Sequence, residues 1–334
     1  MKILHIVPEF EEGGVERYVL SLIHEQVKRN HEITLATAGG KLEKFLPEKI
    51  TLVKLPVHKK NLFTGIYCAL KLFRVRNWDI IHAHSRVPAW IAWLLSSISG
   101  IKWLMTAHAP YSLNFGILPL RHADGIIFCS DSVEKHLRNY LRDNKPETLI
   151  TIPNGFQEPE FAWQGASHKL LFVGYLSKRK GLDIALNALG NLLDYDWTLD
   201  ILGDGSERNN LESLVKNLGI NSRVKFFGFR DDAAKFMSKS GCLLFPSYQE
   251  GLPLTVNEAL SVGIPVLASN IEPLRAISGS PEKLIPVGDV KAWENAIRNF
   301  LETGNASPLS LQKLISFDET VNRIEEFYAR ILLS

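Results

Sequence analysis

The first half of the chain alternates short, continuously apolar runs with stretches in which apolar residues recur at helical spacing. Because the runs are too continuous to be half-exposed antiparallel strands, they predict strands buried on both faces of a parallel sheet. The segment Val15–Arg29 predicts a helix whose apolar stripe contains one polar residue, Gln26. The predicted strands are Ile3–Val7, Ile33–Ala38, Thr51–Lys54, Ile80–Ala83, Trp103–Ala107, Gly125–Cys129 and Thr148–Ile152. Alternation of strand and helix favours a doubly wound domain with right-handed crossovers.

A second alternating series follows a break in this pattern. Pro153-Asn154-Gly155 is strong turn chemistry, and residues 156–168 lack periodicity and are expected to form a linker. The second set of predicted strands is Lys169–Gly174, Trp197–Leu202, Val224–Phe227, Cys242–Phe245, Pro265–Ala268 and Leu284–Pro286. The last segment, Asp318–Leu333, is typical of an amphipathic helix. The expected fold class is therefore α/β, with two doubly wound, Rossmann-like domains that face each other across a cleft.

Composition narrows the class of protein. The 334 residues are 46% apolar and 22% charged, which excludes a disordered chain or a coiled coil. The net charge of +2 gives no reason to expect nucleic acid as a partner. It is divided unevenly, however, because residues 1–150 carry +6 and residues 151–334 carry −4. One half is therefore better suited than the other to an anionic surface.

Cysteine usage and the apolar stretches indicate a cytoplasmic protein. Cys68, Cys129 and Cys242 each lie in an apolar run far from one another, which argues against a disulfide framework or a Cys-x-x-Cys site. The N-terminal residues do not have the pattern of a signal peptide. The longest uncharged apolar stretch, Val87–Ile101, has 15 residues, fewer than the ~20 that a spanning helix needs. It is expected to be a buried helix followed by a strand.

Candidate chemistry lies in the loops that follow strands, where ligands bind in open α/β sheets. Gly13-Gly14 precedes a helix and would let the backbone approach a phosphate, although such a pair is more often only a turn. The segment 174–181 places Lys178, Arg179 and Lys180 between two glycines. This loop suits a diphosphate, and a solvated basic loop is the alternative.

The most informative stretch is Phe245–Ala259. Glu250 ends a strand-following loop, and Pro253 is expected at the first helical position, where its missing N–H costs nothing. The amides of Leu254 and Thr255 would then be unpaired and form an anion site. Glu258 lies about one turn further along the helix. This spacing fits a diol at Glu258, a diphosphate at the helix end and a second polyol at Glu250.

These residues resemble those of a known family. The motifs are Gly13-Gly14-Val15-Glu16, His82-Ala83-His84, Thr106-Ala107-His108, Cys129-Ser130, Pro153-Asn154-Gly155, Gly203-Asp204-Gly205 and the pair Glu250/Glu258. Over nearly its whole length the chain is similar to the retaining glycosyltransferases of family 4 (glycosyl transferases group 1), which have the GT-B fold. The resemblance implies an acceptor-binding domain at 1–155, a nucleotide-sugar-binding domain at 169–315, and a helix at 316–334 that crosses back to the first domain.

The resemblance also implies roles for single residues. Glu258 would bind the ribose, Glu250 a hydroxyl of the transferred sugar, and Lys180 the diphosphate, whose leaving charge it would stabilise. His108 would lie beside the donor sugar, which makes His108, Lys180 and Glu250 the expected catalytic residues. Further donor-binding residues would be Gly13, Gly14, Arg179, Phe229, Arg230, Gly251, Leu254 and Thr255, with His84 and Arg86 on the acceptor side. No cofactor or metal is expected, because the nucleoside diphosphate sugar is a substrate and the acceptor is a carbohydrate or a lipid-linked molecule.

The implied function is transfer of a sugar from UDP or GDP to an acceptor hydroxyl, in cell-surface polysaccharide or glycolipid synthesis. The first domain offers no obvious nucleophile, which suits the front-face mechanism proposed for the family. One position departs from the family pattern, because Tyr175 stands where an arginine is usual. A sugar-nucleotide-binding subunit with little transferase activity is therefore the alternative; an epimerase would need cleft carboxylates that the sequence does not indicate.

Other motifs are expected to have plain explanations. Asp194-Tyr195-Asp196 is interpreted as solvated surface, His82-x-His84 lacks further ligands at metal-binding spacing, and His5 needs no role beyond packing. A stretch from His58 to Trp78 mixes aromatic residues with Lys71, Arg74 and Arg76, as interfacial helices do. It predicts that the first domain docks at the inner face of an anionic membrane. An ordinary amphipathic helix packed on the sheet is the alternative.

Overall fold

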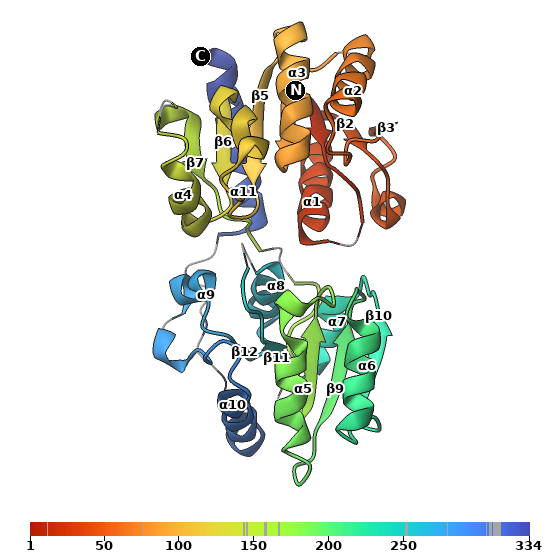
Figure 1. Cartoon of the computed structure of the whole chain (residues 1–334), viewed down its shortest axis with the longest axis vertical. Coiled ribbons are helices and arrows are strands. Elements are labelled where there is room, and N and C mark those ends of the chain that lie inside the picture. Colours follow the sequence, from red (N-terminus) through yellow and green to blue (C-terminus); the bar gives the residue numbers. More distant parts are fainter. Residues whose placement is uncertain are drawn as a thin grey trace. The chain divides into compact units, whose positions relative to one another are not determined.

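The chain forms two compact units, residues 1–154 together with 317–334 (unit 1) and residues 155–316 (unit 2) (Figure 1). This division comes from a computed structural model. The structure describes residues 1–11, 13–75, 77–142, 144, 146–156, 159–165, 168–250, 253–278, 280–304, 306, 309 and 315–334. Arg76 and Gly251 therefore lie outside the described residues, as do positions 157, 158, 166 and 167 of the expected linker.

Unit 1 is built on a parallel sheet in the order β3-β2-β1-β4-β5-β6-β7. The strands are β1 (Lys2–Ile6), β2 (Glu32–Thr37), β3 (Thr51–Lys54), β4 (Ile80–His84), β5 (Lys102–Ala107), β6 (Gly125–Phe128) and β7 (Leu149–Thr151). All the strands predicted for this half are confirmed. The observed strand ends differ from the predicted ends by at most one residue, because hydrogen bonding, and not apolar character, decides where a strand ends.

The helices of unit 1 are α1 (Gly14–Lys28), α2 (Leu62–Arg74), α3 (Arg86–Ser99), α4 (Asp131–Arg138) and α11 (Phe317–Leu333). Their ends follow local chemistry. The side chain of Asn61 caps α2 by accepting the Thr64 N–H at 2.8 Å. Gly100 ends α3 at a φ of 73°, so Val87–Ile101 is a helix followed by the approach to β5, as expected. The helix is buried on one face only, because Ile98 is 47% exposed. Within the described part of the chain, no helix is both long and apolar enough to span a membrane.

The C-terminal helix α11 belongs to unit 1 and supplies part of its core. Val321, Ile324, Phe327 and Tyr328 are fully or almost fully buried. Gly125 at the start of β6 makes room for the helix, because a Cβ there would lie 2.3 Å from Cδ1 of Ile331. The blue ribbon of α11 accordingly lies among the elements of unit 1 (Figure 1).

Unit 2 has a smaller parallel sheet in the order β10-β9-β8-β11-β12. The strands are β8 (Lys169–Val173), β9 (Thr198–Leu202), β10 (Val224–Gly228), β11 (Cys242–Phe245) and β12 (Val266–Ala268). The helices are α5 (Leu182–Gly190), α6 (Arg208–Asn217), α7 (Ala233–Lys239), α8 (Leu254–Val262), α9 (Glu272–Ile277) and α10 (Val290–Thr303). Part of the expected linker packs on this unit, since the indole of Trp163 donates to the Ser240 carbonyl at 2.8 Å.

The prediction of a strand at Leu284–Pro286 is wrong. Only an isolated bridge joins Ile285 to Ser269, through the Ile285 N–H donated to the Ala268 carbonyl at 2.9 Å. A short 3-10 turn at Pro281–Lys283 precedes it, and Pro286 has no N–H with which to extend the ladder. Leu284 and Ile285 are nevertheless buried in the cores, which explains their apolar character.

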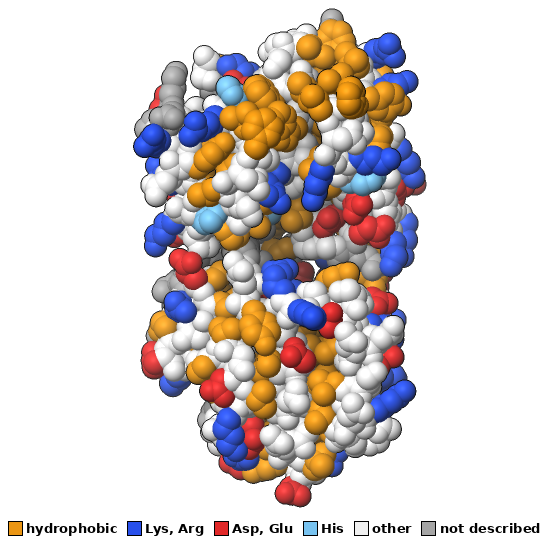
Figure 2. Space-filling view, in the orientation of Figure 1, with side chains coloured by type: hydrophobic (Ala, Val, Ile, Leu, Met, Phe, Trp, Pro, Cys, Tyr) orange, Lys and Arg blue, Asp and Glu red, His pale blue; other side chains and the backbone are white. Residues whose placement is uncertain are grey.

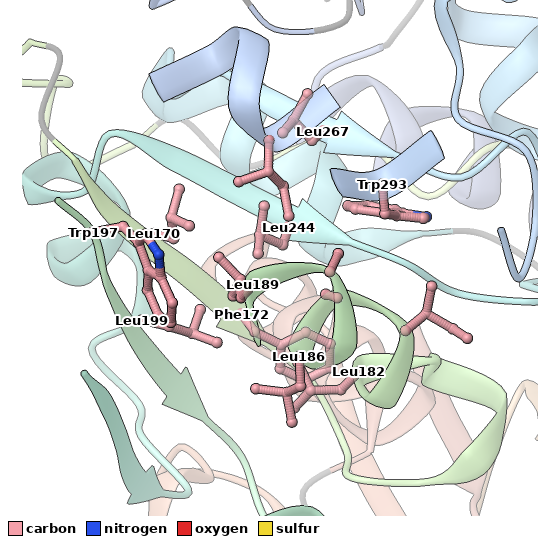
Figure 3. Packing of buried hydrophobic residues seen from close by; sticks show 14 of the residues in the cluster. Leu170, Phe172, Leu182, Leu186, Leu189, Trp197, Leu199, Leu244, Leu267 and Trp293 are labelled. Carbon is pink, nitrogen blue, oxygen red and sulfur yellow. The ribbon is translucent and has the colours of Figure 1, made fainter. Parts of the chain in front are cut away.

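Both faces of the unit 2 sheet are buried. On one face, Phe172, Leu199 and Leu244 from three strands pack with Leu186 and Leu189 of α5 and Trp293 of α10 (Figure 3). On the other face, the alternate positions Leu171 and Leu243 pack with Val256 and Ala259 of α8. Because neighbouring residues of one strand enter opposite cores, the strand must be apolar throughout.

Candidate functional site

The loops after β8 and β11 are joined at the carboxyl edge of the unit 2 sheet. The two strands are neighbours in the sheet, so a short helical turn at Lys178–Lys180 meets the segment 246–250. The Tyr248 N–H donates to the Arg179 carbonyl at 2.9 Å. In return, Nη1 of Arg179 donates to the Gln249 carbonyl at 2.9 Å. The basic loop and the glutamate-bearing loop are thereby held as one structure.

Glycine allows this close approach. Gly181 has a φ of 63°, and a Cβ at this position would lie 2.2 Å from the Pro246 carbonyl oxygen. The loop after β9 is fitted in the same way, because a Cβ at Gly203 would lie 1.9 Å from the Gly174 carbonyl oxygen. The Gly203-Asp204-Gly205 motif therefore contributes loop packing at this edge of the sheet.

The carboxylate of Glu250 lies at the centre of this arrangement. Its Oε2 is 2.8 Å from Nη1 of Arg179, and its Oε1 is 2.8 Å from Nζ of Lys180. The Glu250 side chain is only 6% exposed, and that of Lys180 13%. Two cations on one buried carboxylate leave an excess of positive charge beside it, which an anionic ligand would compensate.

The start of α8 supplies further backbone hydrogen-bond donors. Pro253 occupies the N-cap and not the first helical position expected for it, because its carbonyl accepts the N–H groups of Val256 and Asn257 at 2.9 and 3.1 Å. The amides of Leu254 and Thr255 make no hydrogen bond to another described residue. Glu258 lies one turn further on, half-buried. This helix start can receive an anion.

The structure shows what surrounds Phe229 and Arg230, which are expected at the nucleotide base. It also shows what surrounds Tyr175, which stands where the family usually has an arginine. Arg230 is held by Asp232 through two bonds, Nε–Oδ1 at 2.8 Å and Nη2–Oδ2 at 2.7 Å, and Phe229 beside it is half-buried. Tyr175 is 57% exposed, and its hydroxyl makes no hydrogen bond to a described residue. Tyr175 therefore adds no charge to the basic loop.

In unit 1, the Gly13-Gly14 pair starts α1, with Gly13 as its N-cap. The helix start already faces a carboxylate of the chain, because a Cβ at Gly13 would lie 2.1 Å from Oε2 of Glu16. Burial raises the pKa of Glu16, and the negative charges of Glu9 and Glu11 add to the shift.

A row of buried histidines crosses the unit 1 sheet. His5 Nε2 lies 2.8 Å from Oε1 of Gln26, and His5 Nδ1 lies 3.0 Å from Nε2 of His84. His84 Nδ1 in turn lies 3.2 Å from Nε2 of His108. His84 is thus fully buried and bonded through both ring nitrogens, so it could influence an acceptor only through His108.

A second branch joins the row to the C-terminal helix. His82 Nδ1 lies 2.6 Å from the Tyr328 hydroxyl, and His82 Nε2 lies 2.7 Å from Oγ1 of Thr106. Burial lowers the pKa of His5 to about 4 and that of His108 to about 3, and those of His82 and His84 fall well below the usual value. All four imidazoles are therefore neutral near pH 7.

Sequence reasoning missed part of this row. It assigned His5 to packing and treated Gln26 as a stray polar residue on an apolar stripe. A usable signal was present, because His5 and His82 pair across neighbouring strands, and His84 follows two residues later on the same face. Among the described residues, His5, His82 and His84 form one group with nitrogens close enough to hold a cation, yet every one of those nitrogens already has a protein partner.

Arg86 lies at the start of α3, beside this row. Its guanidinium is 5.1 Å from the ring centre of Tyr111. The Tyr111 hydroxyl accepts the backbone N–H of His108 at 3.4 Å. Ser85 between His84 and Arg86 has a φ of 100°, which is strained for a residue with a side chain. Such strain is typical of functional loops.

Comparison with known proteins agrees with this architecture. A family model described as Glycosyltransferase Family 4 matches residues 12–158, and one described as Glycosyl transferases group 1 matches residues 155–313. An uncharacterized glycosyltransferase of Haemophilus influenzae is 29% identical over 281 residues, which are 78% of each chain. The O-antigen biosynthesis glycosyltransferase WclY of Escherichia coli is 41% identical over 96 residues, 29% of this chain and 27% of that protein.

Among solved structures, HepE of Anabaena in complex with UDP and glucose superposes with a TM-score of 0.81 at 18% identity, covering 99% of this chain and all of the other. Two α/β units, each with a parallel sheet flanked by helices, define the GT-B class of glycosyltransferase folds. The chain belongs to the family 4 type of that class, the glycosyl transferases group 1, and is a transferase of the EC 2.4 type.

Proposed function

We propose that this glycosyltransferase moves a sugar from a UDP- or GDP-sugar to an acceptor hydroxyl with retention of anomeric configuration. The proposal is carried by the Glu250 carboxylate held between Arg179 and Lys180, at 2.8 Å from each, together with the start of α8, where the amides of Leu254 and Thr255 make no hydrogen bond to a described residue. Cations and helix-start amides are the groups that bind a diphosphate. The complex of HepE, a protein of the same fold, with UDP and glucose supports this choice of donor.

The donor would extend over the carboxyl edge of the unit 2 sheet. Its diphosphate would bind the amides of Leu254 and Thr255 together with Arg179 and Lys180. Glu258, further along α8, would accept the ribose hydroxyls. Glu250 would accept a hydroxyl of the transferred sugar. Phe229 and Arg230, in the loop after β10, would contact the base.

The chemistry needs stabilisation of the leaving group more than a nucleophile from the protein. As the bond from the anomeric carbon to the diphosphate breaks, negative charge grows on the leaving oxygen, and the acceptor oxygen bonds to the same carbon. Lys180 would offset that charge most strongly in the transition state. The acceptor proton would pass to the leaving phosphate, which leaves His108 to orient the sugar.

We also propose that the acceptor belongs to cell-surface polysaccharide or glycolipid synthesis and that unit 1 docks on an anionic membrane. The likeness of a 96-residue segment to WclY supports the first part. On α2, Phe63 is 85% exposed and Leu62, Ile66, Tyr67 and Leu70 are 40–60% exposed. Lys71 lies 5.7 Å from the Tyr67 ring centre. Hydrophobic side chains gather on this part of unit 1, near α2 and α3 (Figure 2).

The donor assignment is tested by a thermal-shift panel of UDP- and GDP-sugars. A donor at 100 times its Kd should stabilise unit 2 by about 2.7 kcal/mol. UMP and GMP, which lack the second phosphate, serve as matched controls and should stabilise the protein less. If no nucleoside diphosphate sugar raises the midpoint above that of the monophosphates, the proposed donor site is wrong.

A further inference from the structure

The histidine row follows from the alternation of residues in adjacent strands. His5 of β1 is opposite His82 of β4, and His84 of β4 is opposite Thr106 of β5. His108 comes two residues after Thr106. All these side chains therefore project from one face of the sheet. Gln26 of α1 and Tyr328 of α11 bond to this row from elsewhere in the chain.

The positions of the protons can be derived along the row because a neutral imidazole has one N–H and one acceptor nitrogen. The amide oxygen of Gln26 faces His5, so Nε2 of His5 must be the donor and its Nδ1 an acceptor. Nε2 of His84 then donates to His5, and Nδ1 of His84 accepts from Nε2 of His108. Burial, which keeps these rings neutral, makes each step obligatory.

We propose that Gln26 is a positioning residue that acts through His5 and His84 to hold His108 as its Nε2–H tautomer, with Nδ1 left as an acceptor for a substrate hydroxyl. Nδ1 of His108 makes no hydrogen bond to another described residue, and His108 is the least buried of the four histidines, 9% exposed where the other three are fully buried. The part played by the substrate hydroxyl rests on the proposed function; the tautomer does not.

Tyr328 joins Gln26 to the second branch. The amide nitrogen of Gln26 donates to the Tyr328 hydroxyl at 3.4 Å, and that hydroxyl then donates to Nδ1 of His82 at 2.6 Å. His82 passes its own Nε2–H to Thr106 at 2.7 Å. Reversing the Gln26 amide would reverse every proton from His5 to His108. The tautomers of His5, His84 and His108 are therefore expected to change together or not at all.

The consequence for the substrate is a choice of hydrogen-bond direction. A histidine that presents a lone pair accepts from a hydroxyl, whereas the other tautomer would present an N–H. Because Gln26 and Tyr328 are buried within unit 1, this choice is built into the protein before a ligand binds. A helix at the far end of the sequence thus helps to set the chemistry of a residue in the first third of the chain.

The test is long-range ¹H–¹⁵N NMR of the full chain with ¹⁵N-labelled histidine and no substrate, at pH 7.5. We expect His5, His84 and His108 of the wild type to be more than nine-tenths in the Nε2–H form. Gln26→Met removes the acceptor at similar length and should give mixed tautomers at all three. Gln26→Glu restores an acceptor and should restore the Nε2–H form. Thr106→Val is the matched control, because Thr106 bonds only to His82 of the second branch, and it should leave His5, His84 and His108 in the Nε2–H form.

Each other outcome overturns the proposal. A wild-type spectrum with His108 protonated at Nδ1 does so without any variant, which matters if Gln26→Met fails to fold. Unchanged tautomers in a folded Gln26→Met protein also do so. Equimolar Zn²⁺ should leave the spectrum unchanged; loss of the N–H signals of His5, His82 and His84 together would instead assign a metal site. Because no donor is present, a failure here differs from a failure of the donor panel.

Discussion

Nζ of Lys180 lies 2.8 Å from Oε1 of Glu250, and both side chains are largely buried at the carboxyl edge of the unit 2 sheet. The ammonium group also lies 5.3 Å from the ring centre of Phe245, so it is held in place on two sides. A cation fixed in this way costs little reorganisation when charge appears on a ligand next to it.

Replacing this cation should impair turnover more than binding. In Lys180→Ala we expect kcat to fall about 10- to 100-fold, since a charge-assisted bond contributes roughly 1.5–3 kcal/mol, while the Kd for the donor rises by a smaller factor. Steady-state kinetics and calorimetry separate the two effects. Lys178→Ala, which removes a neighbouring cation of the same loop, is the matched control. If Lys180→Ala keeps its activity within twofold of the wild type, Arg179 or Lys178 stabilises the leaving diphosphate instead.

Placing the family's usual arginine at position 175 should increase the rate of sugar transfer. Tyr175 is 57% exposed and makes no hydrogen bond to a described residue, so its replacement disturbs little packing. Tyr175→Arg is expected to raise kcat about two- to tenfold through one further charge near the diphosphate, an effect of up to ~1.4 kcal/mol. Tyr175→Lys should give part of the gain, and Tyr175→Gln none. An equal rate in all four proteins would show that the arginine is not missed.

The buried histidines should make unit 1 sensitive to acid. An unfolded histidine binds a proton below a pH of about 6.5, whereas folded His5 and His108 bind one only near 4 and 3. Their stabilisation is therefore present above pH 6.5 and is lost as the pH falls toward 4. The slope approaches ~1.4 kcal/mol per pH unit for each histidine that stays neutral.

This loss of stability is measured by urea unfolding at pH 7.5 and 5.5, with hydrogen exchange of individual amides as the readout. We expect the free energy of opening to fall for amides of β1 and β4. Amides of β8 and β11 provide the internal control, since the row lies in unit 1. An equal loss in both sheets, or none in β1 and β4, would contradict the assignment of neutral, buried imidazoles.

The exposed side of α2 should bind anionic vesicles. Each cation near such a surface contributes about 1 kcal/mol, which added salt weakens. In flotation assays we expect binding to vesicles containing phosphatidylglycerol but not to pure phosphatidylcholine. Phe63→Ser should reduce binding severalfold, and Leu193→Ser, an exposed leucine of unit 2, should not. Equal binding to both vesicle types, or to neither, would favour a soluble acceptor and a helix whose charges are merely solvated.

The strands were the most predictable part of the fold. Their continuous apolar runs reflect burial on two faces, which Leu170 and Leu171 illustrate by entering opposite cores. The strand predicted at Leu284–Pro286 was wrong for a related reason. Burial makes a segment apolar, but hydrogen bonding to a neighbouring strand decides whether that segment is a strand. Patterns along the sequence carry information about burial and little about pairing.

The site was predictable only as separate loops. The cations of 178–180 and the carboxylate of Glu250 were recognisable, but their ion pairs depend on β8 and β11 being neighbours, which local pattern does not specify. The link from Gln26 to Tyr328 spans 302 residues. Such contacts appear only once the sheet order and the return of α11 to unit 1 are known.

The proposed donor site on unit 2 is best tested by isothermal titration calorimetry on Glu258→Ala. The best donor from the panel is titrated into the wild type, Glu258→Ala and Glu272→Ala, the last being an exposed glutamate of α9 as control. Loss of a charge-assisted bond to the ribose, roughly 1.5–3 kcal/mol, should weaken binding about tenfold or more in Glu258→Ala and leave Glu272→Ala unchanged. Wild-type affinity in a folded Glu258→Ala protein would contradict the account.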